Sequence, residues 1–361
     1  AGIRRLHHAE LRGDEKMIVR EAEQADDAAL LKIESASAQG DTLRLAEDRT
    51  SFFHRARRFE KPIVLVGENE TTGALLGVMA AAPVTVRVGG EYRKAAYMFD
   101  LRNNSDATGG LSKALYIVWK RLERQLKSEG VEMLFGYVKE DNARAMTIFS
   151  RMGVTRCATF THFTIPVLPK RAVRGAVKVD RRVEADGYRA DVAVRYGEHD
   201  LWPHIDDVEL LQSNYDRSVR GRVTCGSASA LIIDPSLDER RRVTKMPALY
   251  HAVGHIARPL SSFLPIPYIP KLGQELRIWH LVDVIAGQRP EELACVLAQA
   301  NNMAREEGVH YLAAAACPVD AEAQALAKPA LARLNYNVMA VDWAQGVPAM
   351  LPATYFDPRS L

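Results

Sequence analysis

The sequence is short of cysteine, and the cysteines it has form no recognisable motif. Its 361 residues contain four of them, far apart and without a CxxC pair: Cys157, Cys225, Cys295 and Cys317. This spacing excludes the disulfide scaffold of a small secreted domain. We therefore expect reduced thiols and a cytoplasmic protein.

Long apolar runs and an excess of one charge are also missing. The most apolar long stretch, residues 247–270, contains an arginine, two histidines and five prolines, which a membrane-spanning helix would not tolerate. Residues 1–16 mix bases with acids and lack the apolar core of a signal peptide, so we expect an N-terminal tail. A net charge of +3 argues against a dedicated nucleic-acid binder.

The apolar patterns that are present predict a mixed α/β domain over residues 17–168. Alternating or continuous apolar runs predict strands, whereas apolar residues every three to four positions predict helices. Gly89 and Gly90 form a hairpin turn between two strands. We expect strands at 17–22, 63–68, 75–88, 94–101 and 132–138, closing strands within 154–167, and helices after Asp26 and at 44–59, 111–126 and 141–153.

The rest of the chain repeats this domain in outline. Residues 279–285 (WHLVDVI) resemble 96–102 (AYMFDLR), which aligns Asp283 with Asp100. In the same way 306–317 resembles 128–138, and 330–343 resembles 147–160. We expect a basic linker at 169–186 and a degenerate copy at 187–361 that has lost a glycine loop. Its apolar insertion, 247–270, is a packed connection, a roof over an acceptor cleft or a contact for a partner chain.

Two short motifs in the first domain suggest a binding site. A helix N-terminus offers unpaired N–H groups and a positive dipole, and small residues let the backbone approach phosphate oxygens closely. Taken alone, such a loop fits better as a flexible strand-to-helix turn that binds nothing. The loop is Asp106-Ala107-Thr108-Gly109-Gly110-Leu111, and the second motif, NxxAxxxFxxxGV, consists of Asn142, Ala145, Phe149, Gly153 and Val154.

With the order of elements around them, these motifs resemble the GNAT superfamily of acyl-CoA-dependent N-acyltransferases over residues 17–168. The family loop reads Arg/Gln-x-x-Gly-x-Gly/Ala, and its second motif reads Asn-x-x-Ala-x-x-x-Tyr-x-x-x-Gly-Phe. The resemblance implies two GNAT-like domains in tandem, the second degenerate. It also implies acetyl-CoA or another acyl-CoA as co-substrate, and no metal.

The resemblance further implies where the cofactor would lie. Loop amides would hold its pyrophosphate, the pantetheine arm would pair with the strand edge at 99–102, and Asn142 would bond the arm. Considered alone, Asn142 fits better as a helix-capping residue. The implied cofactor-binding residues are Phe99, Leu101, Arg102, Asp106, Ala107, Thr108, Gly109, Gly110, Leu111, Ser112, Asn142, Ala145 and Phe149.

Two residues depart from the family pattern, and two others are candidates for proton transfer. Asp106 replaces a basic or amide residue, and its carboxylate would repel a pyrophosphate. Phe149 replaces the tyrosine that protonates the leaving thiolate in many members, and a phenyl ring has no proton to donate. Asp100 is the candidate base, with a solvent-facing or paired strand carboxylate as the alternative. Tyr137 is a weaker candidate acid, with a position in the core or the cleft wall as the alternative.

We therefore expect an acyltransferase, in first place an N-acetyltransferase, in which an amine attacks the thioester directly. The acceptor is an amine-bearing small molecule or protein. The protein acts as a monomer or homodimer, without nucleic acid or a membrane span. Two alternatives stay open: a non-catalytic coenzyme A-binding sensor or interaction scaffold, and a long-chain N-acyltransferase.

Overall fold

The computed structural model describes residues 7–10, 16–36, 44–104, 113–204, 218–237, 239–261, 263–346 and 350–357. The first half of the chain contains helices α1 (Asp27–Ala36), α3 (Lys113–Ser128) and α4 (Ala143–Arg151), and short 3-10 turns η1 (Gln24–Asp26), η2 (Phe52–His54) and η3 (Ala56–Arg58). Its strands are β1 (His7–Glu10), β2 (Lys16–Glu21), β3 (Arg44–Arg49), β4 (Ile63–Asn69), β5 (Leu75–Val88), β6 (Glu91–Asn103), β7 (Met133–Lys139) and β8 (Thr155–Pro166).

The second half has a similar set of elements. Its helices are α5 (Ala185–Tyr196), α7 (Ala248–Leu260), α8 (Pro290–Glu306) and α9 (Ala321–Ala327), with a 3-10 turn η4 (Pro235–Leu237). Its strands are β9 (Val177–Asp180), β10 (Val219–Cys225), β11 (Ala228–Ile233), β12 (Glu239–Lys245), β13 (Glu275–Leu276), β14 (Ile278–Ile285), β15 (Tyr311–Ala316) and β16 (Ala332–Asp342).

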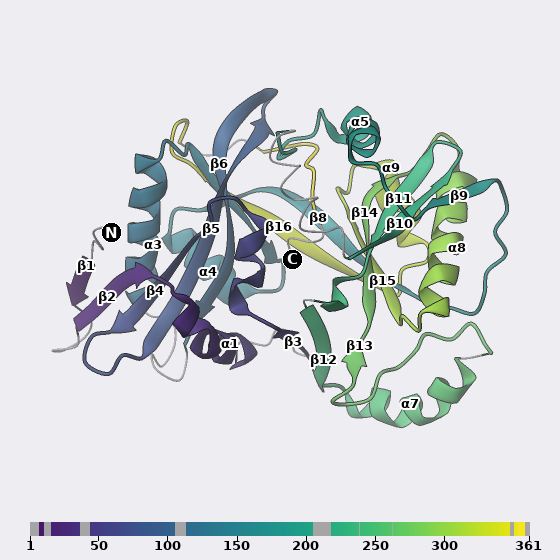
Figure 1. The fold of residues 1–361 in the computed structure, drawn as a ribbon, viewed down its shortest axis with the longest axis horizontal. Coiled ribbons are helices and arrows are strands. Elements are labelled where there is room, and N and C mark those ends of the chain that lie inside the picture. The colour runs from purple at the N-terminus through teal and green to yellow at the C-terminus, as the bar shows by residue number, and fades with distance from the viewer. Residues whose placement is uncertain are drawn as a thin grey trace.

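One large mixed sheet runs through both halves, in the order β1-β2-β4-β5-β6-β7-β16-β8-β15-β14-β11-β10-β9. The halves exchange their last strands. Strand β16 lies between β7 and β8, and β8 in turn lies between β16 and β15. Figure 1 shows β16 crossing the middle of the molecule toward the first half. Each half therefore completes the sheet of the other.

The same arrangement of strands recurs in both halves, as the internal repeat predicts. Strand β6 pairs in parallel with β7 from Ala95↔Met133, and β14 pairs in parallel with β15 from Ile278↔Tyr311. The neighbouring β5–β6 and β11–β14 pairs are antiparallel. The last matched segment is wrong in part: aligning 330–343 with 147–160 continues a helix to residue 334, whereas strand β16 already begins at Ala332 and the counterpart of α4 is the earlier helix α9.

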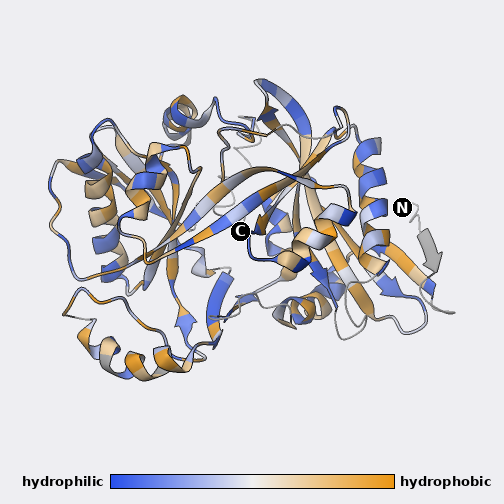
Figure 2. Cartoon of the chain, turned by 180° about the vertical axis from the view of Figure 1, so that it is seen from behind, coloured by the Kyte–Doolittle hydropathy of each residue, from blue (hydrophilic) through white to orange (hydrophobic). Residues whose placement is uncertain are grey.

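Helices cover the sheet with their apolar faces. Helix α3 buries Leu115, Val118, Trp119, Leu122 and Leu126 against the strands of the first half, while α8 buries a similar row in the second half. Strands beneath α3 are largely orange in Figure 2, whereas the helix itself alternates between blue and orange. The predicted helical period at 111–126 is therefore confirmed for the part of the helix that the structure describes.

The predicted helix at 44–59 is wrong. This segment is strand β3 followed by the short turns η2 and η3. Strand β3 pairs with β12, with Leu45 opposite Val243, in a small sheet of order β13-β12-β3. The local helical pattern of this segment is overridden because a strand from the other half of the chain pairs with it. A local sequence pattern cannot reveal such a partner.

The structure also bears on three smaller predictions. Residues 154–167 form one strand, β8, in place of several. The basic segment 169–186 includes β9, which pairs with β10 at the far end of the large sheet, so part of it is ordered strand. The apolar segment 247–270 includes α7, and Leu249, Tyr250 and Phe263 in or near that helix are exposed. The domain boundaries themselves stay predictions.

Candidate functional site

Strands β6 and β7 pair over only a short length. Their parallel register runs from Ala95↔Met133 to Met98↔Gly136 and stops there, although β6 continues to Asn103 and β7 to Lys139. On its other side β7 pairs with β16 along its whole length. Gly136 marks the last β6–β7 pair, where an added Cβ would lie 3.0 Å from the Met98 carbonyl oxygen. The two strands approach closely at Gly136 and have no mutual pairing afterwards.

A β-bulge follows immediately in β6. The β5–β6 register shifts between Ala80↔Phe99 and Val78↔Arg102. Asp100, inside the shift, has a φ of 49°, a left-handed conformation that Asp adopts more readily than most residues. Its side chain is 1% exposed. The bulge thus turns a carboxylate into the protein interior beside the unpaired part of β6.

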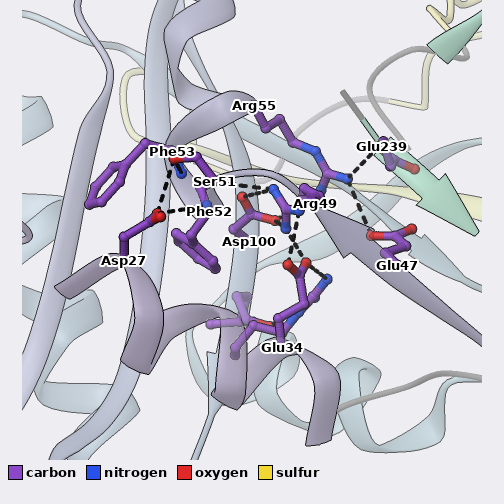
Figure 3. Close-up of polar contacts among 12 residues, drawn as sticks. Asp27, Glu34, Glu47, Arg49, Ser51, Phe52, Phe53, Arg55, Asp100 and Glu239 are labelled. Carbon is purple, nitrogen blue, oxygen red and sulfur yellow. Dashed lines mark hydrogen bonds and ion pairs between the residues drawn. The ribbon is translucent and has the colours of Figure 1, made fainter. Parts of the chain in front are cut away.

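Two arginines hold this carboxylate (Figure 3). Arg49, the last residue of β3, contacts both oxygens, with Nη2–Oδ1 at 2.9 Å and Nη1–Oδ2 at 3.1 Å. Arg55 Nη1 donates to Asp100 Oδ1 at 2.9 Å. A bidentate guanidinium makes strong, charge-assisted hydrogen bonds to a carboxylate. Because Arg49 and Arg55 flank η2, these bonds also fix the path of the chain between β3 and β4.

The ion pairs continue in both directions from Asp100. On one side Arg49 donates to Glu34 of α1, from Nε at 2.9 Å and also from Nη2. On the other side Arg55 Nη2 lies 3.7 Å from Glu47 and 4.0 Å from Glu239 of β12. Glu239 accepts in turn from Arg241 at 3.1 Å. This charged network, Glu34–Arg49–Asp100–Arg55–Glu239–Arg241 with Glu47 beside it, joins the two halves of the chain.

The arginines of the network favour the ionised form of two of its carboxylates, Asp100 and Glu239. Burial by itself would raise the pKa of Asp100, but Arg55 and Arg49 outweigh it and hold that pKa well below its usual range. Burial also opposes ionisation of Glu239, yet Arg241 and Arg55 lower its pKa to about 2. Asp100 has the arrangement of a paired strand carboxylate. Such a group is a poor proton acceptor, because protonation would leave two buried guanidinium groups uncompensated.

Two buried histidines lie at the Arg241 end of the network, and the sequence analysis missed them. His162 of β8 and His280 of β14 are 8% and 4% exposed. Burial, followed by the charge of Arg241, lowers the pKa of His162 to about 4 and that of His280 to about 3. His162 Nδ1 and His280 Nε2 have no hydrogen-bond partner among the described residues. Both imidazoles are therefore neutral near pH 7.

No sequence signal marked these histidines, because each stands alone on an apolar strand. His280 aligns with Tyr97 when Asp283 is aligned with Asp100. The matching strands differ as well: Tyr97 pairs with Phe135, whereas His280 pairs with Ala313. The second half thus keeps the strand positions of the first half. At this pair of positions, however, two aromatic side chains are replaced by a histidine and an alanine.

The predicted cofactor-binding residues fall into two groups. Asp106, Ala107, Thr108, Gly109, Gly110, Leu111 and Ser112 lie outside the described residues. Of the others, Phe99, Leu101 and Arg102 follow Met98 on β6, where pairing with β7 has ended. Asn142, Ala145 and Phe149 all belong to α4 or its N-terminus.

The α4 residues have clear local roles. Asn142 Oδ1 accepts from the Ala145 N–H at 3.0 Å, so Asn142 caps the helix. Phe149 is 4% exposed and packs in the core that α3 and α4 form on the sheet. Gly153 follows the helix with a φ of 75°, which suits a glycine that ends a helix.

Tyr137, the candidate acid, lies in an aromatic cluster on the opposite face of the sheet. Its ring contacts Phe356 at a centroid distance of 4.7 Å, Tyr97 at 5.3 Å and Phe160 at 5.4 Å. Burial raises its pKa well above the usual value. A tyrosine with a raised pKa keeps its proton at neutral pH, as an acid must before it acts, but it also releases that proton less readily.

Two further searches concern the described residues only. Among them, no helix combines the length and the apolar character needed to cross a membrane. Within the same part of the chain, no three His, Cys, Asp or Glu side chains gather as a metal site would require.

Sequence comparisons with protein-family models and with curated proteins find no match. Solved structures do resemble this chain. Saccharomyces cerevisiae N-myristoyltransferase with bound myristoyl-CoA and inhibitors has a TM-score of 0.60 at 11% identity, over 93% of this chain and 86% of that one. A tandem GNAT protein from the clavulanic acid biosynthesis pathway has a TM-score of 0.55 at 12% identity, over 91% and 98%.

A GCN5-related N-acetyltransferase from Kribbella flavida has a TM-score of 0.52 at 9% identity, over 91% of this chain and 72% of that one. At such identities the likeness is one of fold. It agrees with the parallel β6–β7 and β14–β15 pairs, which recur in the two halves. The chain therefore shares the GNAT-like fold of these structures, with two GNAT-like lobes.

Proposed function

We propose that this protein is an acyl-CoA-dependent N-acyltransferase whose first half binds the acyl-CoA. One observation carries the proposal: within the GNAT fold, β6 loses its partner β7 after Met98↔Gly136 and continues to Asn103. From Phe99 onward no described strand pairs with β6 on that side, which leaves a strand edge along Phe99, Leu101 and Arg102. The amide groups of a pantetheine arm can add to such a strand segment as another strand would.

The remaining contacts of the cofactor follow from this placement. The thioester would lie near the bulge at Asp100, and the pyrophosphate of the cofactor would lie toward residues 106–112, which precede α3 in the sequence. Asn142 sits at the N-terminus of α4, which follows β7 directly. Its Nδ2 group would bond the arm while its Oδ1 keeps the capping bond to Ala145.

The reaction is a direct transfer. A neutral amine attacks the thioester carbonyl, a backbone N–H of β6 stabilises the oxyanion, and the C–S bond breaks as the amide forms. Asp100 is held by Arg49 and Arg55, and Phe149 has no proton, so water takes the proton of the amine and water protonates the thiolate. We expect turnover to rise with pH as more of the amine becomes neutral.

Thermal unfolding with acyl-CoAs tests the binding step. Acetyl-CoA or lauroyl-CoA should raise Tm, and a ligand at 100 times its Kd stabilises by about 2.7 kcal/mol. Desulfo-coenzyme A and ATP serve as controls for the arm and the nucleotide. Thiol release across a panel of small amines and peptides then tests transfer, and comparison of the two donors decides between short and long acyl chains. No Tm shift at millimolar acyl-CoA would contradict the proposal.

A second candidate is a coenzyme A-binding sensor without catalysis. The specific observation in its favour is that the two obvious proton-transfer positions are unsuitable: Asp100 is locked in ion pairs, and Phe149 lacks a hydroxyl. Acyl-CoA binding without thiol release for any amine would decide for this candidate.

A further inference from the structure

Cys225 and Cys295 come from distant parts of the sequence and meet beneath one glycine. Cys225 is the last residue of β10, and Cys295 lies within α8, which packs beside that strand (Figure 1). A Cβ added at Gly175 would lie 3.2 Å from the Cys225 sulfur and 3.4 Å from the Cys295 sulfur. Both sulfurs therefore border the same small volume, which a side chain at residue 175 would occupy.

Other contacts hold the pair in place. The Cys295 thiol donates to the Arg174 carbonyl at 3.0 Å. Val177, two residues after Gly175, pairs with Cys225 across the β9–β10 ladder. The backbone around Gly175 is thereby fixed on both sides of the two sulfurs.

We propose that Cys225 and Cys295 form a site for thiol–disulfide exchange and close a reversible disulfide when the protein meets a small disulfide oxidant. A disulfide requires two sulfurs that can approach to about 2.05 Å without large backbone movement. Residue 175 puts no Cβ into the space beside these two sulfurs, because it is a glycine. Gly175, Gly226 and Ser227 are exposed, so the pair lies one residue deep beneath the surface.

The exchange proceeds in two steps. One cysteine thiolate attacks a sulfur of the oxidant, forming a mixed disulfide and releasing the first oxidant thiolate. The second cysteine then attacks the protein sulfur of that mixed disulfide, which closes the Cys225–Cys295 bond and releases the second oxidant thiolate. Two protons leave the cysteines, and two electrons pass to the oxidant.

The environment of Cys225 predicts slow thiol–disulfide exchange at neutral pH. Burial, followed by the neighbouring Cys295 side chain, raises the pKa of Cys225. Glu292 raises it further, whereas Arg289 opposes the rise. Only the thiolate attacks, so the rate should increase about tenfold for each pH unit below that pKa.

The remaining cysteines provide the controls. Cys157 is buried against the Val338 carbonyl at 3.5 Å, and Cys317 against the Pro352 carbonyl at 3.8 Å. With both changed to alanine, C157A/C317A leaves only the proposed pair. After treatment with oxidised glutathione at pH 8.5, this variant should lose both free thiols without retaining glutathione. In C225S/C157A/C317A the single remaining cysteine should stop at the mixed disulfide.

Peptide mapping of the unmodified protein gives a second readout, in case the alanine variants fail to fold. Trypsin would release residues 223–240 and 278–305, and oxidation should join these two peptides. Dithiothreitol should separate them again. Tm should rise on oxidation by about 2–6 °C, because the bond restricts the unfolded chain.

Three results would overturn the proposal. Glutathione adducts on both cysteines would show that the sulfurs cannot reach each other. Two unreacted thiols after hours at pH 8.5 would show that the oxidant has no access. A lower Tm after oxidation would show that the bond distorts the native fold.

Discussion

Asp100 and Asp283 occupy the same β-bulge in the two halves of the chain. Their φ angles are 49° and 50°, and both lie where the register of an antiparallel strand pair shifts. Their partners differ. Asp100 is held by Arg49 and Arg55, whereas Asp283 accepts from the hydroxyls of Tyr188 and Tyr355, the latter at 2.7 Å. The repeat preserves the backbone of the bulge and changes its electrostatics.

This relationship provides a matched pair of variants. Asp100→Asn keeps the shape and tolerates the left-handed φ, but it leaves two buried guanidinium groups without their shared anion. We expect it to lower the free energy of unfolding by about 3 kcal/mol. Asp283→Asn changes the same backbone position, yet its amide oxygen still accepts from a tyrosine, so the loss should be about 1 kcal/mol. Urea unfolding measures both.

An equal loss in the two variants would show that strain at the bulge, and not the ion pairs, determines the effect. Arg242→Gln is the surface control. Arg242 pairs with Asp48 at 2.8 Å, and both side chains are exposed, so the urea midpoint should stay close to that of the unmodified protein.

The two buried histidines make stability depend on pH. The pKa of His162 is about 4 and that of His280 about 3, both below their unfolded value of 6.5. Below pH 6.5 the unfolded chain therefore binds more protons than the folded one, and stability falls as pH decreases. The slope should approach about 1.4 kcal/mol per pH unit for each histidine near pH 5. The double variant H162Q/H280Q should have a flatter Tm profile from pH 7 to 4, and an unchanged slope would exclude this origin.

At pH values below about 4, protonation of carboxylates in the charged network should lower the stability of the protein. Folded-state pKa values below the unfolded ones mean that Asp100 and Glu239 stabilise the protein above about pH 4, and that this contribution is lost as pH falls toward 2. Asp100→Asn should remove part of the loss below pH 4, in addition to lowering stability at pH 7. A parallel profile for this variant between pH 4 and 2 would contradict the assignment.

Gly136 should determine how closely β6 and β7 approach. Gly136→Ala would place a Cβ 3.0 Å from the Met98 carbonyl oxygen, and relief of this contact should cost about 1–3 kcal/mol of stability. Gly187→Ala is the control, because no heavy atom lies within 4 Å of the added Cβ and the residue is inside α5. That variant should be stabilised by about 0.5–1 kcal/mol. A neutral Gly136→Ala would show that the strands separate without strain.

Two variants of Asn142 can distinguish a helix-capping role from a role in cofactor binding. Asn142→Ala should lose about 1 kcal/mol of stability, because the bond to the Ala145 N–H disappears, while Asn142→Ser can keep a cap. If the amide also bonds the pantetheine arm, both variants should need several-fold more acyl-CoA for the same Tm shift. Ligand affinity in Asn142→Ser equal to that of the unmodified protein would restrict Asn142 to capping.

How much the sequence predicts depends on the range of the interactions. Gly89 and Gly90 separate β5 from β6 as expected, and α3 follows its apolar period, because a turn and an amphipathic helix are determined by neighbouring residues. The internal match of Asp283 to Asp100 was also readable, since both halves keep the same pattern around the bulge.

The sequence could not predict the ion pairs, the buried histidines or the exchange of strands between the two halves. Arg49 and Asp100 are fifty-one positions apart, and Arg55 reaches Glu239 of the other half. Residues 44–59 have a helical pattern, but β12 supplies a strand partner and the network supplies buried counter-charges, so β3 forms there.

By itself, the sequence determined the elements whose stability is local, their order, and the repetition of that order. The tertiary structure decided which charges are buried together, where β6 loses its partner, and which half supplies each central strand. The physical reason is that a buried charge or an exchanged strand gains its free energy from a partner far along the chain. No local pattern of residues specifies that partner.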